Sequence, residues 1–330
     1  MQRLAQLCDY CAQVPLDDPA SGPDGSWSLG SGTRIKNSDC PFCQVVVRAV
    51  QTHYQTASSS RPTTPLSQQS NVILEINSSN GPGGRLAFSL RGYMQEFWIC
   101  IAESMSSSVR DPRHKYLCPV VGAEFDVGRL TNWIAACTQS HSHHRCGLTA
   151  SSFHECFPAL DVLRFVDVNL LAIAELQRVP EYIALSYVWG ETSSIRLTTT
   201  SRSSFLVAGY IEKVWDYIPR TIKDAIELTR RLGMRYLWVD ALCLMQNDPD
   251  DVSRGVSMMD EIYERSWLTI IAASGHDANA GLPGIAEGSR CSTTAIPVTK
   301  DVSVGIYVPL DRLMKCSVYE SRAWTYVTFI

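Results

Sequence analysis

The sequence lacks any run of apolar residues that approaches the ~18 needed to cross a membrane. Its opening, MQRLAQLCDYCAQVPLDDP, has no apolar stretch of the kind that a secretory signal carries. An excess of positive charge is absent as well, because the net charge is −4. Nucleic acid and anionic membranes are therefore not expected partners. We expect a soluble, cytoplasmic protein without a transmembrane segment.

Two nucleotide-binding patterns are also missing. Neither G-x-G-x-x-G nor G-x-x-x-x-G-K-[ST] occurs, so a standard dinucleotide or P-loop site is unsupported. Cysteine, in contrast, is plentiful, with 12 among 330 residues. A chain of this length without a secretory signal belongs to a reducing compartment, where cysteines are more often buried apolar residues, metal ligands or nucleophiles than disulfide partners.

Two Cys-x-x-Cys pairs give the strongest chemical signal, Cys8 with Cys11 and Cys40 with Cys43. Four thiolates at tetrahedral spacing suit Zn²⁺, and a gap of two residues lets both sulfurs of a pair reach one ion. The loop between the pairs is rich in Gly, Ser, Asp and Pro and longer than in common zinc ribbons. The pattern predicts a structural zinc site in residues 1–56, with buried free cysteines as the alternative.

Residues 57–160 form a second predicted region. NVILEI and RLAFSL read as a hairpin, and VGRLTNWIAACTQSHSHHRC begins as a short helix. This last segment ends in a cluster that is either a second metal site or, as is commoner, a solvated loop. The cluster comprises Cys137, His141, His143, His144 and Cys146.

Residues 161–330 are expected to form an α/β domain. The apolar runs 182–189, 235–244 and 267–274 read as buried strands. A helical stripe precedes Gly233, and Asp248-Pro249 opens a second helix between the later strands. Alternating strands and helices with short connections predict a parallel sheet, in which ligands bind beyond the carboxyl ends of the strands.

Polar residues follow two of these strands, so both groups are expected to face one crevice. Each also has a structural interpretation: a core edge, a tight turn, a helix cap or a buried thiol. The candidate ligand-binding residues are Ser186, Tyr187, Trp189, Gly190, Cys243, Gln246 and Asp248. Asp240 is the leading candidate for a catalytic carboxylate, because a carboxylate at the end of a buried strand must be paired, hydrogen-bonded or exposed in a crevice.

The second half resembles the fungal HET (heterokaryon incompatibility) domain. The motifs that carry the resemblance are YIALSYVWG, YLWVDALCLMQNDPDD, MMDEIYERSWLTIIAASGHDANAGLPG and the late SRAWTY. The resemblance implies a core distantly similar to TIR domains, which are flavodoxin-like, and a role in nonself recognition and programmed cell death. Some TIR domains self-associate as death adaptors and some hydrolyse NAD with a glutamate. The cysteine-bearing start is similar to the leader of many such proteins.

The chain departs from this family pattern at two places. Gly255 stands where many relatives carry a glutamate, and Val252 stands where an aromatic is common. The closing motif reads WTYVTFI rather than continuing with Gln-Glu, which suggests a domain incomplete at its C-terminus. An enzyme of this type would rely on Asp240 with Asp248 or Asp251.

Three functional hypotheses follow from the resemblance. The first is an incompatibility protein that signals by self-association, as a homo-oligomer or with other incompatibility proteins. The second is an NAD-cleaving enzyme at the strand-end crevice. The third is a degenerate, inactive member of the family.

Overall fold

The computed structural model divides the chain into two compact units. Unit 1 comprises residues 1–122 and 291–316, and unit 2 comprises residues 123–290 and 317–330. This division differs from the ranges 1–56, 57–160 and 161–330 expected from the sequence. The structure describes residues 7–15, 25–56, 65–77, 87–90, 98–102, 122–140, 152–191, 195–290, 296–297, 303–307, 314 and 317–320.

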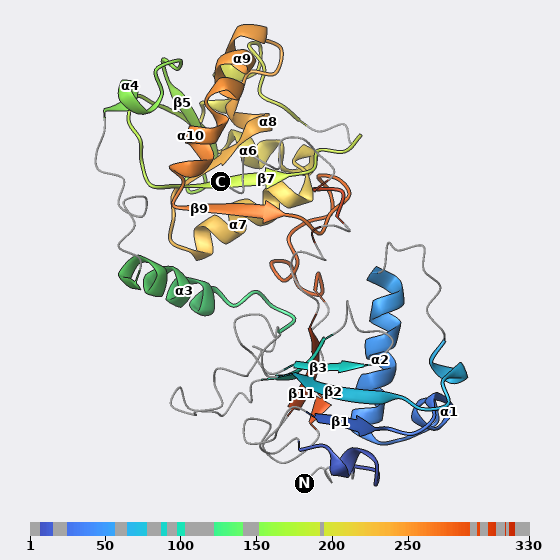
Figure 1. Cartoon of the computed structure of the whole chain (residues 1–330). Coiled ribbons are helices and arrows are strands. Elements are labelled where there is room, and N and C mark those ends of the chain that lie inside the picture. Colours follow the sequence, from blue (N-terminus) through green and yellow to red (C-terminus); the bar gives the residue numbers. More distant parts are fainter. Residues whose placement is uncertain are drawn as a thin grey trace. The chain divides into compact units, whose positions relative to one another are not determined.

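Unit 1 is an α+β unit built on a six-stranded sheet in the order β1-β2-β3-β4-β11-β10, antiparallel throughout (Figure 1). Its strands are β1 Gly25–Ser28, β2 Ile73–Asn77, β3 Ala87–Leu90, β4 Trp98–Ala102, β10 Ile296–Pro297 and β11 Ser303–Tyr307. Its helices are η1 Cys11–Gln13, α1 Gly32–Lys36, α2 Pro41–Thr56 and η2 Leu66–Gln68. The predicted hairpin is confirmed as β2 and β3.

The core of unit 1 joins helix α2 to the sheet. The apolar face of α2 includes Phe42, Val46 and Ala49, which are fully buried. They share one cluster with Val72 and Leu74 from the β2 segment. Three of the four predicted metal-site cysteines lie in this same cluster, so the cysteine site is part of the core of the unit.

Unit 2 holds a five-stranded mixed sheet in the order β6-β5-β8-β7-β9 (Figure 1). Its strands are β5 Leu163–Asp167, β6 Ala172–Leu176, β7 Tyr182–Tyr187, β8 Tyr236–Val239 and β9 Leu268–Ala272. Its helices are α3 Val127–Ser140, α4 Phe153–Cys156, α5 Arg202–Phe205, α6 Tyr210–Lys213, η4 Trp215–Tyr217, α7 Arg220–Arg231, α8 Asp240–Cys243, α9 Pro249–Ser257 and α10 Met259–Glu264.

The α/β class and the parallel core of unit 2 are confirmed. Strand β7 pairs in parallel with β8 on one side and with β9 on the other. The expectation of a parallel sheet is wrong at one edge, where β5 pairs antiparallel with both β6 and β8. The β5–β6 hairpin was missed because its strands lie within a segment that carries no turn signal of the Asn-Gly type.

Helices cover both faces of this sheet. Ile183 and Leu185 of β7 pack with Ile222 and Ile226 of α7 in one cluster on one face. Alternate residues of β7 and β8 point to the other face, where they pack with α4 and α10. The predicted stop of α7 is confirmed, because Gly233 follows its end with a φ of +72°.

Candidate ligand pocket and cysteine cluster

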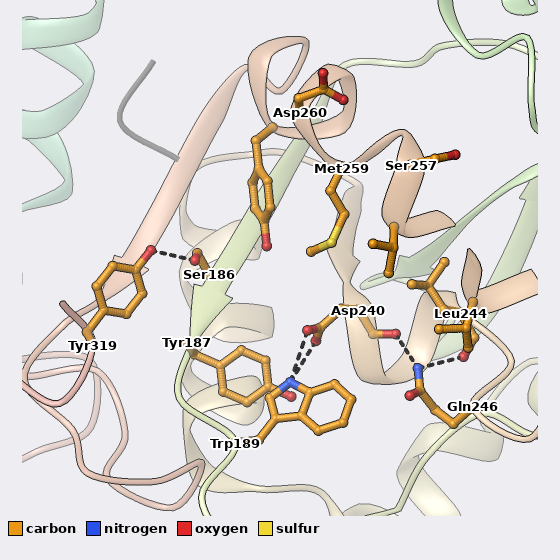
Figure 2. A pocket seen from close by; sticks show the side chains of 13 residues that line it. Ser186, Tyr187, Trp189, Asp240, Leu244, Gln246, Ser257, Met259, Asp260 and Tyr319 are labelled. Carbon is orange, nitrogen blue, oxygen red and sulfur yellow. Dashed lines mark hydrogen bonds between the residues drawn. The ribbon is translucent and has the colours of Figure 1, made fainter. Parts of the chain in front are cut away.

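A pocket of about 470 Å³ opens at the carboxyl ends of β7 and β8 in unit 2 (Figure 2). This volume lies in the range of small-molecule sites, which is about 300–1,000 Å³. The pocket brings together five of the residues predicted from the sequence, Ser186, Tyr187, Trp189, Asp240 and Gln246. The expectation that both strand ends face one crevice is therefore met for these five.

Asp240 lines the pocket, and two neighbouring N–H groups hold its carboxylate. The indole Nε1–H of Trp189 donates to both carboxylate oxygens, at 3.1 and 3.0 Å, and the backbone N–H of Ala241 donates to Oδ1 at 2.7 Å (Figure 2). The carboxylate thus accepts a backbone N–H of the first turn of α8 while it lines the pocket. The guanidinium of Arg196 lies 4.7 Å from the centroid of the Trp189 ring, so a cation stacks on the indole that holds Asp240.

Tyr319 is a pocket residue that sequence reasoning missed. Its hydroxyl lies 2.5 Å from Ser186 Oγ, although 133 residues separate the two in the chain (Figure 2). Tyr319 is 1% exposed, so this hydrogen bond satisfies a buried hydroxyl. Its position two residues before the SRAWTY motif was a signal that could have drawn attention to it.

The opposite wall of the pocket is apolar and comes from α9 and α10. Val252, Val256, Met259 and Tyr263 line it, together with Leu244. Val252, Val256, Met259 and Tyr263 follow one another three or four residues apart and so form one apolar stripe. The structure breaks the helix at Met258 and leaves these four stripe residues partly exposed to the pocket, while Ile262 alone is fully buried.

Three of the candidate ligand-binding residues do not line the pocket, and each has a structural role. Gly190 has a φ of +66°, and a Cβ there would lie 2.4 Å from Cβ of Asp277, so the turn requires glycine. Asp248 caps α9 by accepting from the backbone N–H groups of Asp250 and Asp251. Cys243 is buried and accepts from the N–H of Val239 at 3.3 Å.

Burial raises the pKa of the Cys243 thiol to about 12. A thiol with this pKa stays protonated at neutral pH and is a poor nucleophile. The structure thus favours the interpretation of Cys243 as a packing residue.

Asp251, the other proposed catalytic carboxylate, lies apart from the pocket in a buried ion pair. Arg164 donates to both of its oxygens at 2.9–3.0 Å, and the backbone N–H of Met245 donates to Oδ2 at 2.8 Å. Arg164 also donates to Glu175 at 3.0 Å and to the Cys243 carbonyl at 3.2 Å. These contacts tie β5, β6 and α9 to the loop that follows α8, which positions Leu244 and Gln246 of the pocket.

Gly255 sits in the middle of α9 against Leu244. The residue is buried. A Cβ at this position would lie 2.3 Å from Cδ2 of Leu244, so any larger side chain must displace this pocket residue. The packing of Leu244 against this position therefore favours glycine.

The four cysteines of the Cys-x-x-Cys pairs come together in unit 1. Their sulfurs all lie within 4.8 Å of one another, with Cys8 Sγ 3.8 Å and Cys11 Sγ 3.6 Å from Cys43 Sγ. A tetrahedral ion with bonds of about 2.3 Å places its sulfurs about 3.8 Å apart, whereas a disulfide needs about 2.05 Å. Cys11, Cys40 and Cys43 are buried and Cys8 is half-buried, so the geometry fits the sulfur ligands of one closed metal site.

The second cysteine and histidine cluster is only partly described. Cys137 is exposed on α3. The other four members, and the closing motif at 321–326, lie outside the described residues. Within the described part of the chain, no helix is both long and apolar enough to cross a membrane.

Two comparisons with known proteins point to heterokaryon incompatibility proteins. The family model described as Heterokaryon incompatibility protein (HET) matches residues 182–327. A curated protein of Neurospora crassa, "Heterokaryon incompatibility protein 6, OR allele", is 26% identical over 167 residues. The match covers 47% of this chain and 23% of that protein. The search of solved structures gave no significant match. Residues 182–327 of this chain are thus similar to the HET family.

Proposed function

We propose that this protein acts in fungal nonself recognition and triggers programmed cell death by self-association. The observation that carries the proposal is the HET domain over residues 182–327. The name of the Neurospora relative supports the same role, although the chain spans less than a quarter of the length of that relative, 23%. Induced expression in a filamentous fungus, followed by counts of viable cells, tests the proposal.

An exposed apolar patch of unit 2 supports self-association through this unit. Leu170, Leu206 and Val207 are 50%, 37% and 55% exposed. They lie near one another, because the N–H of Gly209 donates to the Leu170 carbonyl at 2.8 Å. The Leu170 turn is rigid, since the Asp167 carboxylate accepts from two of its backbone N–H groups at 3.0 Å. Exposed apolar groups on a rigid turn suit association with a second copy.

Sedimentation or light scattering over a range of concentrations tests this surface. We expect Leu170→Lys to shift the protein toward monomer, because it places a charge in the apolar contact. Asn169→Lys is the matched control, because Asn169 is the exposed neighbour of Leu170 and its replacement introduces the same positive charge. Equal association of both variants and the wild type would show that another surface is used.

The alternative function is cleavage of NAD in the pocket. The pocket that brings Ser186, Trp189 and Asp240 together supports this alternative. The strand order of the parallel core supports a flavodoxin-like or TIR-like fold, because the first strand, β7, lies between the second and the third. Release of nicotinamide from NAD⁺ by the wild type, lost in Asp240→Ala and kept in Asp250→Asn, would establish this activity. No release by the folded protein would exclude it.

We also propose that Cys8, Cys11, Cys40 and Cys43 hold a structural zinc ion. The four sulfurs within 4.8 Å of one another support it. Four thiolates leave no open position for substrate, so the ion would stabilise the fold of unit 1 rather than catalyse a reaction. Elemental analysis should give one zinc per chain in the wild type and a loss of zinc in Cys11→Ser. Cys137→Ser, at an exposed cysteine, should keep the metal.

A further inference from the structure

We propose that Arg34 is a fifth component of the cysteine site. Its guanidinium holds two of the sulfurs and offsets the charge of the metal complex. The inference rests on the zinc proposed above. It extends the site beyond its four cysteines to a residue that no Cys-x-x-Cys pattern indicates.

The guanidinium of Arg34 contacts one cysteine of each pair. Nη1 donates to Cys8 Sγ at 3.4 Å and Nη2 donates to Cys43 Sγ at 3.5 Å. Both distances are within the range of hydrogen bonds to sulfur. A planar, forked donor can make both contacts at once, whereas the ammonium of a lysine is a single point of charge. Arg34 therefore bridges the two pairs as well as neutralising them.

The Leu29 carbonyl and the Tyr10 ring also fix the position of this guanidinium. Nε donates to the Leu29 carbonyl at 3.0 Å, and Nη2 donates to the same oxygen. The guanidinium carbon lies 4.4 Å from the centroid of the Tyr10 ring, and Tyr10 stands between Cys8 and Cys11 in the chain. The first cysteine loop and the end of β1 are thus connected through Arg34.

Gly30 leaves the space that Arg34 occupies. Its φ is +77°, and a Cβ would lie 2.9 Å from Arg34 Nε and 3.3 Å from Cε1 of Tyr10. The backbone of Arg34 is fixed too, because its N–H donates to Ser31 Oγ at 3.3 Å, which caps α1. These contacts restrict the conformations of the Arg34 side chain, which lowers the entropy cost of its contacts with the sulfurs.

The net charge of the metal complex explains why Arg34 should matter for metal binding. Four thiolates around a divalent cation leave a complex with two negative charges, and three of these cysteines are buried. Buried net charge is costly unless it is paired and hydrogen-bonded. The positive charge of Arg34 offsets one of these two negative charges, and its N–H groups hydrogen-bond to two of the sulfurs. We expect Arg34 to slow the loss of zinc.

The test uses the full chain loaded with zinc and the chelator 4-(2-pyridylazo)resorcinol in excess. We expect Arg34→Met to release zinc about 10- to 100-fold faster than the wild type, as for other residues that support metal ligands. Arg34→Lys should release zinc at an intermediate rate, because it keeps the positive charge but loses the forked pair of N–H donors. Lys36→Gln is the control, since it removes a positive charge from an exposed position of the same helix and should release zinc at the wild-type rate.

A spectrum separates a direct contact with sulfur from general support of the fold. With Co²⁺ in place of zinc, the sulfur-to-metal charge-transfer bands should shift in Arg34→Met while the tetrahedral d–d bands remain. A wild type that binds neither zinc nor Co²⁺ would refute the metal site itself. A wild type that binds metal, with release rates and charge-transfer bands unchanged in both Arg34 variants, would overturn the role of Arg34 alone. If Arg34→Met does not fold, Arg34→Lys decides by the same two measurements.

Discussion

Replacement of Asp251 by asparagine should destabilise unit 2 through its buried ion pair with Arg164. The two side chains are 8% and 9% exposed, and the closest pair of charged atoms is 2.9 Å apart. Asparagine has the same shape and keeps an oxygen for the N–H of Met245. The change therefore removes the negative charge and leaves the positive charge of Arg164 buried beside Glu175 alone.

The magnitude follows from the cost of breaking a buried pair by removal of one partner, which is about 3–5 kcal/mol. Glu175 still pairs with Arg164 at 3.0 Å, so we expect the lower end, about 3 kcal/mol. For a unit of this size, each kcal/mol lowers the melting temperature by about 2–4 °C, which gives a decrease of roughly 6–12 °C. Thermal unfolding followed by circular dichroism measures it.

Asp250→Asn is the matched control. Asp250 occupies the same first turn of α9 but is exposed, so removal of its charge should change the melting temperature by at most about 2 °C. Joint replacement, Arg164→Met with Asp251→Leu, should cost less than Asp251→Asn, because no buried charge is left without its partner. Equal melting of Asp251→Asn and Asp250→Asn would refute the reasoning and return Asp251 to the list of functional candidates.

Three further predictions concern single residues. Gly255→Ala should lower the free energy of unfolding by about 1 kcal/mol in urea, because the clash with Leu244 outweighs the gain in helix propensity; a stabilised variant would contradict the packing. Hydrogen bonds from Arg202 and Arg164 outweigh the effect of burial and lower the pKa of Glu175 in the folded protein. The ionised Glu175 therefore contributes fully to stability above the unfolded pKa of ~4.3, and this contribution disappears as the pH falls through the lower folded pKa. Glu175→Gln should therefore reduce the dependence of the free energy of unfolding on pH at acid pH. An unchanged dependence on pH would argue against the pairing. Iodoacetamide at pH 8 should label the exposed Cys137 but label Cys243 only after denaturation, as read by peptide mass spectrometry; rapid labelling of Cys243 in the native protein would revive it as a nucleophile.

The parts of the fold that the sequence predicted well are those with local signals. The three parallel strands are short, continuous apolar runs, and Asp248-Pro249 is a local pattern for the start of a helix. The strand-end candidates Ser186, Trp189 and Asp240 met in one pocket because a parallel sheet brings the carboxyl ends of its strands to one edge. The Cys-x-x-Cys spacing predicted the cysteine cluster, because a gap of two residues lets both sulfurs of a pair reach one point.

The features that sequence reasoning missed depend on contacts between distant residues. Arg164 meets Asp251 across 87 residues, and Ser186 meets Tyr319 across 133. Nothing in the sequence near Arg34 marks it as a partner of Cys8 and Cys43, because its contacts arise only after α1 packs near the start of the chain. The antiparallel strands β5 and β6 were missed for a different reason, because the sequence that connects them, DVNLLA, contains neither glycine nor proline.

The most direct test of the proposed function is the viability of fungal cells in which the protein is induced. We expect the wild type and Asn169→Lys to kill cells, and Leu170→Lys, expressed to the same level, to leave them alive. This outcome would connect cell death to association through the patch of Leu170, Leu206 and Val207. Normal growth of cells that accumulate folded wild-type protein would contradict the account, whatever its state of association.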